Sequence, residues 1–172
     1  MSMQVEKTYA QVNSDQYLRI QQFIYREARL ADDSQYKDWE SLWDTEGTYW
    51  IPVGDGKYNP DEEVSIVHDN RARIGSRIRQ LESGRRYAQV PASVMRRTVS
   101  NIEVERFADG EYRVHANFMM LELPLQSCKE LRLWGGRVEY VLRERGEDLK
   151  IGYKKVLLVN ASGPIANLPF LI

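Results

Sequence analysis

The first third of the chain has apolar residues at helical spacing. Five of them lie three or four positions apart, with polar residues between them: Tyr17, Ile20, Ile24, Ala28 and Ala31. This pattern predicts an amphipathic helix over residues 14–31, and the polar residues 13–15 are typical of a helix start. A second, shorter helix is predicted from Gln35 to about Trp43.

Two short strands and a third helix are predicted next. The strands cover residues 48–51 and 64–67, and the segment between them is rich in Gly, Asn and Pro, as loops are. Asp69 or Asn70 can cap the helix, and Gly84 can end it. Its apolar positions are Ile74, Ile78 and Leu81.

From Met95 onward the apolar period changes to two, which is typical of strands. The first of these strands is expected to place four residues on one face: Thr98, Ser100, Ile102 and Val104. The next strand is expected to place five residues on one face: Tyr112, Val114, Ala116, Phe118 and Met120. Asp109-Gly110 and residues 145–148 predict hairpin turns, and a last strand is predicted from Leu149 to about Asn160.

The third long strand changes the phase of its apolar positions. Leu131 and Leu133 are apolar before the Gly135-Gly136 pair. After the pair, the apolar residues have the other parity: Val138, Tyr140 and Leu142. Since a shift of one residue turns side chains to the opposite face, we expect a bulge or bend at the glycine pair.

The order of the elements indicates the fold class. Helices that precede a long antiparallel meander are typical of an α+β domain rather than a parallel α/β fold. We expect a cone-shaped, strongly curved and mostly antiparallel sheet, with about three helices on its inner face and a pocket inside the cone. No internal repeat or linker divides the chain, so we predict a single domain over residues 1–172 with a flexible N-terminal arm at residues 1–12.

Composition excludes several classes of function. The 172 residues carry 24 basic and 25 acidic side chains, so charge-driven binding of nucleic acid or of a membrane is not expected. No apolar run approaches the roughly 20 residues of a membrane span, and the polar start lacks the pattern of a signal peptide. A cytoplasmic protein is therefore expected. The single cysteine, Cys128, excludes an internal disulfide and is interpreted as a small apolar residue in a strand.

Motifs for metals and nucleophiles are scarce. A Rieske centre needs two cysteines and two histidines, whereas this chain has one cysteine. Composition allows a non-heme iron triad of His68, His115 and Asp69, but the two histidines are not spaced to share one face of a helix. Zinc-ligand spacings, phosphate-binding glycine loops and nucleophile elbows do not occur in the sequence. No cofactor is therefore expected in this chain.

Acid–base chemistry in the cone pocket is an alternative. It requires a carboxyl group of raised pKa beside a tyrosine. Candidate residues are Tyr25, Asp38, Asp44, Tyr49 and His115. Each also has a structural interpretation, because tyrosines suit a core, aspartates suit helix surfaces and ends, and His115 falls on the polar face of its strand.

Arginines concentrate around the third helix and the start of the meander: Arg71, Arg73, Arg77, Arg79, Arg85, Arg86, Arg96 and Arg97. A solvated face is one interpretation. A subunit interface, where arginine pairs with carboxylates, is another. Nucleic-acid binding is a third, which the near-neutral net charge and the lack of an aromatic platform disfavour.

From about Tyr17 to Ile172, a series of segments matches one family in order and spacing. Among them are Phe23-Ile-Tyr-Arg-Glu-Ala-Arg-Leu30, Trp39-Glu-Ser-Leu-Trp43, Tyr49-Trp-Ile-Pro-Val53, His68-Asp-Asn-Arg71, Ser100-Asn-Ile-Glu-Val104 and Lys154-Lys-Val-Leu-Leu-Val-Asn160. With these segments the chain resembles the small (beta) subunits of aromatic ring-hydroxylating dioxygenases. That resemblance implies the cone-shaped fold of nuclear transport factor 2.

The resemblance also implies partners and chemistry. It predicts assembly with a large alpha subunit, as three alpha plus three beta chains, with beta–beta contacts in a trimer. The Rieske 2Fe–2S cluster, the mononuclear iron and the substrate pocket are expected in the alpha subunit. That subunit uses electrons from NADH to add O₂ to an aromatic ring during aromatic catabolism. The beta subunit is expected to be structural and non-catalytic.

The residues expected at the subunit interface lie on the exposed face of the sheet and near the arginine-rich helix. Trp134 and Arg137 come first, because Trp and Arg dominate many interfaces. Core packing and a surface ion pair are the alternative for these two residues. Arg77, Arg96 and Arg97 come second.

Two rival functions remain open for a chain of this fold. A stand-alone isomerase or dehydratase needs a catalytic acid in the pocket. Isomerases with this fold have an acid just before the proline that ends the first strand, where this chain has Ile51. A small-ligand binding protein needs a cone left open by Trp39, Trp43 and Trp50.

Overall fold

The fold consists of three helices and six strands, seen in a computed structural model that describes residues 12–84, 91–125, 130–163, 165, 168 and 170–172. The helices are α1 (Ser14–Asp32), α2 (Tyr36–Ser41) and α3 (Arg71–Glu82). The strands are β1 (Trp43–Pro52), β2 (Ser65–Asn70), β3 (Val94–Ala108), β4 (Glu111–Leu123), β5 (Arg132–Arg145) and β6 (Asp148–Leu158). Cys128 and most of the predicted N-terminal arm lie outside the described residues.

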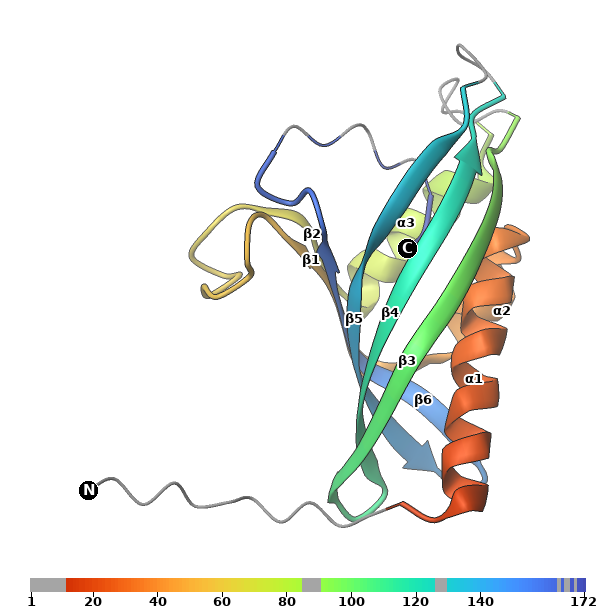
Figure 1. The fold of residues 1–172 in the computed structure, drawn as a ribbon, viewed down its shortest axis with the longest axis vertical. Coiled ribbons are helices and arrows are strands. Elements are labelled where there is room, and N and C mark those ends of the chain that lie inside the picture. Colours follow the sequence, from red (N-terminus) through yellow and green to blue (C-terminus); the bar gives the residue numbers. More distant parts are fainter. Residues whose placement is uncertain (1–11, 85–90, 126–129, 164, 166–167, 169) are drawn as a thin grey trace.

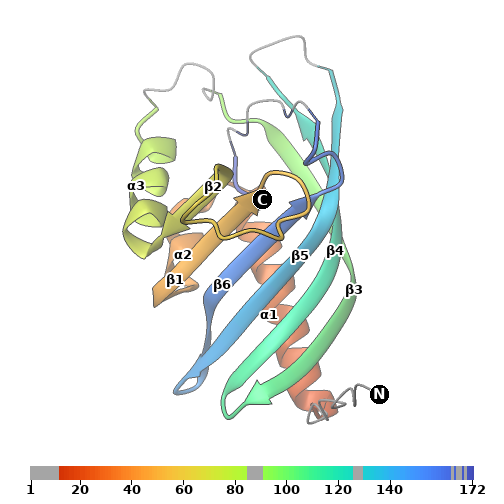
Figure 2. The same cartoon turned by 90° about the vertical axis from the view of Figure 1, so that its left-hand side faces the viewer.

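All six strands form one curved sheet. Their order is β2-β1-β6-β5-β4-β3. β1 runs parallel to β6, and the other neighbouring pairs are antiparallel. α1 lies across the concave side of the sheet, while α2 and α3 cover the end formed by β1 and β2 (Figure 1, Figure 2). The predicted α+β class, with a curved, mostly antiparallel sheet and helices on its inner face, is confirmed.

Local capping sets the starts of α1 and α3. The Asn13 side chain accepts a hydrogen bond from the backbone N–H of Gln16, and the Gln16 side chain accepts one from the backbone N–H of Asn13, at 2.8 and 3.1 Å. Asn70 accepts a bond from the backbone N–H of Arg73 at 3.0 Å. These bonds satisfy amides that the first helical turn leaves free, so both starts follow from local sequence.

The prediction for the second helix was wrong at its end. α2 stops at Ser41, because Trp43 already pairs with Ile151 of β6 as the first residue of β1. β2 likewise continues through Asp69 to Asn70, so only Asn70 acts as the cap of α3. In both places a strand pairing with a distant segment moves the boundary.

The alternation predicted for β4 is confirmed, and so are the two hairpins. All five predicted residues are buried: Tyr112, Val114, Ala116, Phe118 and Met120. Gly110 and Gly146 have φ angles of 66° and 64° in the two-residue turns that join β3 to β4 and β5 to β6. Glycine adopts this left-handed conformation without a Cβ clash.

The single face predicted for β3 was wrong. Its register with β4 shifts between Ser100 and Glu103, where Asn101 has a φ of 53°. This bulge turns the strand over, because one extra residue reverses the alternation. Ile102 therefore packs against the core, whereas Thr98 lines a hollow on the opposite, convex face.

The bulge predicted at Gly135-Gly136 was also wrong. Pairing of β5 with β4 continues through both glycines without a shift, and pairing with β6 begins at Gly136 in the same register. A Cβ at Gly136 would lie 2.1 Å from the Leu157 carbonyl oxygen, so the glycine permits a close backbone approach. The phase does not change, and Leu131 and Leu133 stay exposed on the convex face. The register shift in β5–β6 lies instead between Val141 and Leu142.

Aromatic rings fill the space between the sheet and the helices. Trp39 of α2 lies 5.3 Å from Trp43 and 6.0 Å from Tyr49, measured between ring centroids, and the latter two rings are 5.8 Å apart. All three side chains are buried. The predicted pocket in the cone is therefore occupied by side chains at this position.

Candidate functional site

A buried ion pair joins α1 to β6 beneath the aromatic rings. The Lys154 ammonium lies 2.7 Å from Glu27 Oε1, and both side chains are 1% exposed. Trp39 Nε1 donates to Glu27 Oε1 at 2.6 Å, and the Tyr140 hydroxyl donates to Glu27 Oε2 at 3.1 Å. The ammonium also lies 5.4 to 5.8 Å from the ring centroids of Trp39, Tyr49 and Tyr140.

Electrostatics favour the ionised form of Glu27. Burial opposes ionisation of Glu27, but the charges of Lys154 and Arg97 and the bonds from Lys154 and Trp39 hold the pKa of its carboxyl below the usual value. Burial lowers the pKa of the Lys154 ammonium, and the Glu27 carboxylate opposes that shift. Burial also raises the pKa of Tyr49 to about 12.

This arrangement suits a structural role better than proton transfer. A general acid or base must reach a substrate proton, directly or through one water. Both Glu27 oxygens accept bonds from the protein, and the Tyr49 hydroxyl donates to the Ile172 carbonyl at 2.9 Å. A substrate would have to displace packed core side chains to reach any of these groups.

The residues predicted for acid–base chemistry do not come together. Tyr25 is exposed on α1 beside Arg29 and Arg96. Asp44 is buried at the start of β1, where burial opposes ionisation but bonds from Arg145, the Thr45 amide and Arg143 hold its pKa below the usual value. His115 is on β4 and pairs across the strands with Glu103 and Glu139 on the convex face.

The residues proposed as a metal triad are likewise separated. Asp69 accepts a bond from Arg77 at 2.6 Å, and His68 Nδ1 lies 3.8 Å from Asp61. His115 is on a strand that does not neighbour β2. Across the described part of the chain, no three His, Cys, Asp or Glu side chains are placed to hold a metal ion. These residues do not fit a metal centre. No helix among those described is long and apolar enough to cross a membrane.

The two residues predicted first for an interface lie in different surroundings. Trp134 is buried; its Nε1 donates to Glu122 Oε2 at 2.9 Å, and its ring meets Phe170 edge to face at 5.4 Å. Arg137 is exposed on β5 and lines the convex hollow. In the single chain, Trp134 therefore packs in the core, as the alternative interpretation expected. An interface role for Trp134 or Arg137 stays a prediction.

The arginines predicted second also differ from one another. The Arg97 side chain is 4% exposed and donates to Asp32 Oδ1 at 2.7 Å and to the Leu171 carbonyl at 2.8 Å. Arg96 is 71% exposed, 3.3 Å from Asp33. Arg77 pairs with Asp69. Arg97 therefore ties α1 and β3 to the end of the chain, whereas Arg96 remains accessible.

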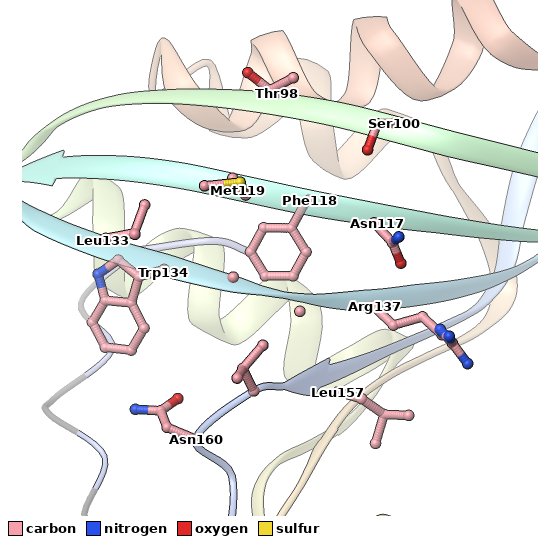
Figure 3. A pocket seen from close by; sticks show the side chains of 13 residues that line it. Thr98, Ser100, Asn117, Phe118, Met119, Leu133, Trp134, Arg137, Leu157 and Asn160 are labelled. Carbon is pink, nitrogen blue, oxygen red and sulfur yellow. The ribbon is translucent and has the colours of Figure 1, made fainter.

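A hollow of about 930 Å³ opens on the convex face of the sheet. Strands β3, β4, β5 and the end of β6 supply its lining, which includes Thr98, Met119, Leu133, Arg137 and Asn160 (Figure 3). The lining is apolar at one end and polar at the other, with Arg137 as its charged residue. Sequence reasoning pointed to the exposed face of the sheet and to Arg137, but it missed the apolar part of this surface, because the phase change predicted at the glycines would have turned Leu133 inward.

Sequence reasoning also missed the buried pair, although a signal was present. Glu27 lies three residues after Ile24 and four before Ala31, on the apolar face of the helix. Lys154 alternates with Val156 and Leu158 on the core face of β6. A charged residue on an otherwise apolar face is unusual enough to call for a buried partner.

Comparison with known proteins points to one group. A family model described as "Ring hydroxylating beta subunit" matches residues 26–162. The beta subunit of benzoate 1,2-dioxygenase from Acinetobacter baylyi is 30% identical, over 83% of this chain and 85% of that protein. The beta subunit of toluate 1,2-dioxygenase from Pseudomonas putida is 26% identical, over 84% of this chain and 90% of that protein.

Solved structures show the same fold. The beta subunit of benzoate 1,2-dioxygenase from Burkholderia mallei superposes with a TM-score of 0.74 and 23% identity, over 94% of this chain and 99% of that one. A chain of naphthalene 1,2-dioxygenase, solved with indole in its active site, gives a TM-score of 0.77 and 13% identity, over 95% of this chain and 90% of that one.

Proposed function

Because the chain belongs to the ring hydroxylating beta subunit family, we propose that it is the structural, non-catalytic subunit of an aromatic ring-hydroxylating dioxygenase. Its role is to support the assembly of the alpha subunits that add O₂ to an aromatic ring. The names of its relatives include benzoate, toluate and biphenyl dioxygenases, so the proposed substrate class is an aromatic ring in a catabolic reaction.

The buried Glu27–Lys154 pair is the observation that carries a structural role. It occupies the region between sheet and helices where a cone-shaped enzyme would hold a substrate. A buried ion pair with every carboxylate oxygen bonded acts as a rigid link between α1 and β6. The candidate acid–base groups Tyr25, Asp44 and His115 lie at separate places, which further supports this proposal.

Membership of a beta subunit family implies an alpha subunit partner. We propose three alpha and three beta chains in the cytoplasm, with the beta chains in contact with one another. We propose that the Rieske cluster and the mononuclear iron belong to the alpha subunit.

Co-purification tests this proposal. The chain is expressed alone and together with the large-subunit reading frame beside it, and mass, iron content and the Rieske absorbance are measured. We expect a mixed complex with iron from the pair, and an iron-free, inactive protein from the chain alone. A stable chain that binds no large subunit, or that shows isomerase or dehydratase activity by itself, would overturn the proposal.

A further inference from the structure

Apolar side chains form a continuous area on the convex face of the sheet. Leu121 pairs across the strands with Leu133, and Met119 lies one row away. Leu133 is 64% exposed and Val159 is 87% exposed. We call this area the outer patch; its exposed members are Met119, Leu121, Leu131, Leu133 and Val159.

The outer patch is not needed for the core of the single chain. The opposite faces of β4 and β5 already bury their side chains against the helices. Contiguous exposed apolar area of this kind marks a contact with another molecule. Figure 3 shows Met119 and Leu133 at one end of the hollow and Arg137 at the other.

The charges around the hollow indicate the chemistry of the molecule that binds there. Within the described residues, no carboxylate lies within ion-pair distance of Arg137, and the hollow has no acidic lining residue. Arg96 of β3 pairs across the strands with Leu121, and its side chain is 71% exposed although it also contacts Asp33 at 3.3 Å. An occupant that complements this surface therefore presents apolar side chains beside carboxylates.

The same chain carries such a surface in the loop between β1 and β2. Residues 53–64 contain four acidic residues and one lysine. Asp55 pairs with Lys57 at 3.3 Å and Asp61 lies 3.8 Å from His68 Nδ1, which leaves Glu62 and Glu63. Among the described residues, Glu62 and Glu63 have no cation at ion-pair distance, and Val64 beside them is 84% exposed.

The loop is held in a defined shape. The Tyr58 hydroxyl accepts a bond from the Val53 amide at 2.9 Å and donates to the Val64 carbonyl at 3.0 Å. The Tyr58 ring meets Trp50 edge to face at 5.6 Å, and Lys155 donates to the Gly56 carbonyl at 2.8 Å. The loop projects from the body on the convex side of the sheet (Figure 1, Figure 2). Little ordering is therefore required when it binds.

We propose that the loop 53–64 of one copy of this chain docks on the outer patch of a neighbouring copy. Glu62 and Glu63 face Arg137 and Arg96, and Val64 covers the apolar end of the hollow. The inference rests on the proposed role of the chain in an assembly with beta–beta contacts. This contact joins two different surfaces, so each copy can bind the next in the same way. The copies then close into a ring when the rotation from one copy to the next is suitable.

The loop is a better occupant than a second outer patch. Two outer patches placed face to face would bring Arg137 of each copy to a hollow that has no acidic lining residue. Like charges without partners in a contact disfavour association. The loop supplies both the carboxylates and an exposed apolar side chain.

Disulfide trapping tests the pairing of surfaces. In a Cys128→Ser background, chains with Glu62→Cys and chains with Arg137→Cys are mixed and oxidised, alone and in complex with the large subunit. We expect disulfides between the two kinds of chain. Arg137→Cys disulfides with themselves would show patch-to-patch contact and overturn the inference. Leu18→Cys, exposed on α1, is the control for random collision.

Oligomeric state gives a second measurement. We expect Leu133→Glu to dissociate the copies, and Leu18→Glu, at a similarly exposed leucine, to leave them associated. Arg137→Glu alone should weaken association of the copies. Addition of Glu62→Arg and Glu63→Arg to the same chain should restore it, because the opposite charges then face each other again. Circular dichroism checks that each variant is folded.

The outcomes separate this inference from the proposed function. If Leu133→Glu keeps the copies together but loses the large subunit, the outer patch contacts that subunit and the inference is wrong. If the wild-type chain is monomeric and gives no trapped pair, yet still purifies with the large subunit and iron, the proposed function stands and the inference fails.

Discussion

The Lys154 ammonium contacts the Glu27 carboxylate at 2.7 Å, although 127 positions separate the two residues. Neither side chain is accessible to solvent, and Trp39 and Tyr140 supply the remaining hydrogen bonds to Glu27. The cost of removing two charges from water is thus offset by a fully bonded arrangement. α1 and β6 are joined at one defined position.

Removal of one partner of this pair should destabilise the chain strongly. Lys154→Met leaves Glu27 as an unpaired buried charge, for which we expect a loss of about 3–5 kcal/mol in the free energy of unfolding. Urea denaturation measures it. The double variant Lys154→Met with Glu27→Gln should lose less than the single variant, because no buried charge remains. Equal losses would show that the ion pair itself, not the unpaired charge, determines stability.

Asp44 should contribute to stability only above acidic pH. Its folded-state pKa lies below the usual 3.8, since bonds from Arg145, the Thr45 amide and Arg143 outweigh the effect of burial. The ionised form therefore stabilises the folded chain above pH 3.8, and this contribution is lost as pH falls through the lower folded-state value. Wild type should exceed Asp44→Asn in stability at neutral pH, and the difference should shrink in acid. An unchanged difference at low pH would contradict this assignment.

Two adjacent glycines should respond differently to alanine. A Cβ at Gly136 would lie 2.1 Å from the Leu157 carbonyl oxygen, whereas at Gly135 the nearest contact is the Phe118 carbonyl oxygen at 3.5 Å. We expect Gly136→Ala to destabilise the chain by about 1–3 kcal/mol or more, because backbone atoms must move. Gly135→Ala should change stability by less than about 1 kcal/mol. Thermal unfolding of the two variants makes the comparison.

Substitution of the adjacent residues Arg96 and Arg97 by alanine should have different effects on stability. Arg97→Ala removes the guanidinium from the buried Asp32 carboxylate, which keeps only the bond from the backbone N–H of residue 97, and it leaves the Leu171 carbonyl without its side-chain donor. We expect a loss of about 3–5 kcal/mol, because the buried carboxylate no longer has a counter-charge beside it. Arg96→Ala removes an exposed contact with Asp33 and a bond to the neighbouring Met95 carbonyl, and it should change stability by less than about 1 kcal/mol. Urea denaturation of the single chain distinguishes the two. If Arg97→Ala is neutral there but weakens the complex, Arg97 acts at an interface instead.

Local signals allowed much of the fold to be predicted. Asn13 and Asn70 form caps with residues three positions away, and Gly110 and Gly146 turn two-residue hairpins. The alternation of apolar and polar residues in β4 was sufficient to identify its core face. Errors arose at points that strand pairing decides: β6 ends α2 early by pairing with Trp43, and the bulge at Asn101 in the pairing of β3 with β4 reverses β3.

The sequence was a poorer guide to which candidate site residues lie together. Tyr25, Asp44 and His115 were grouped by chemical type, yet they lie on different elements and different sides of the molecule. Trp134 was predicted to lie either at an interface or in the core, and only the structure shows that its indole packs on Phe170 within the single chain. Residue type identifies what a side chain can do, but not which side chains meet.

By itself, the sequence determined the helices, the meander, the α+β class and the family, because these depend on periodicity, caps and turns among neighbouring residues. Tertiary structure alone decided the parallel pairing of β1 with β6, the meeting of Glu27 with Lys154, and the exposure of Leu131 and Leu133. The physical reason is that strand register and burial depend on contacts between segments far apart in the chain. One extra residue at Asn101 changes which side chains of β3 face the core, whereas the close backbone approach at Gly136 leaves the alternation of β5 unchanged.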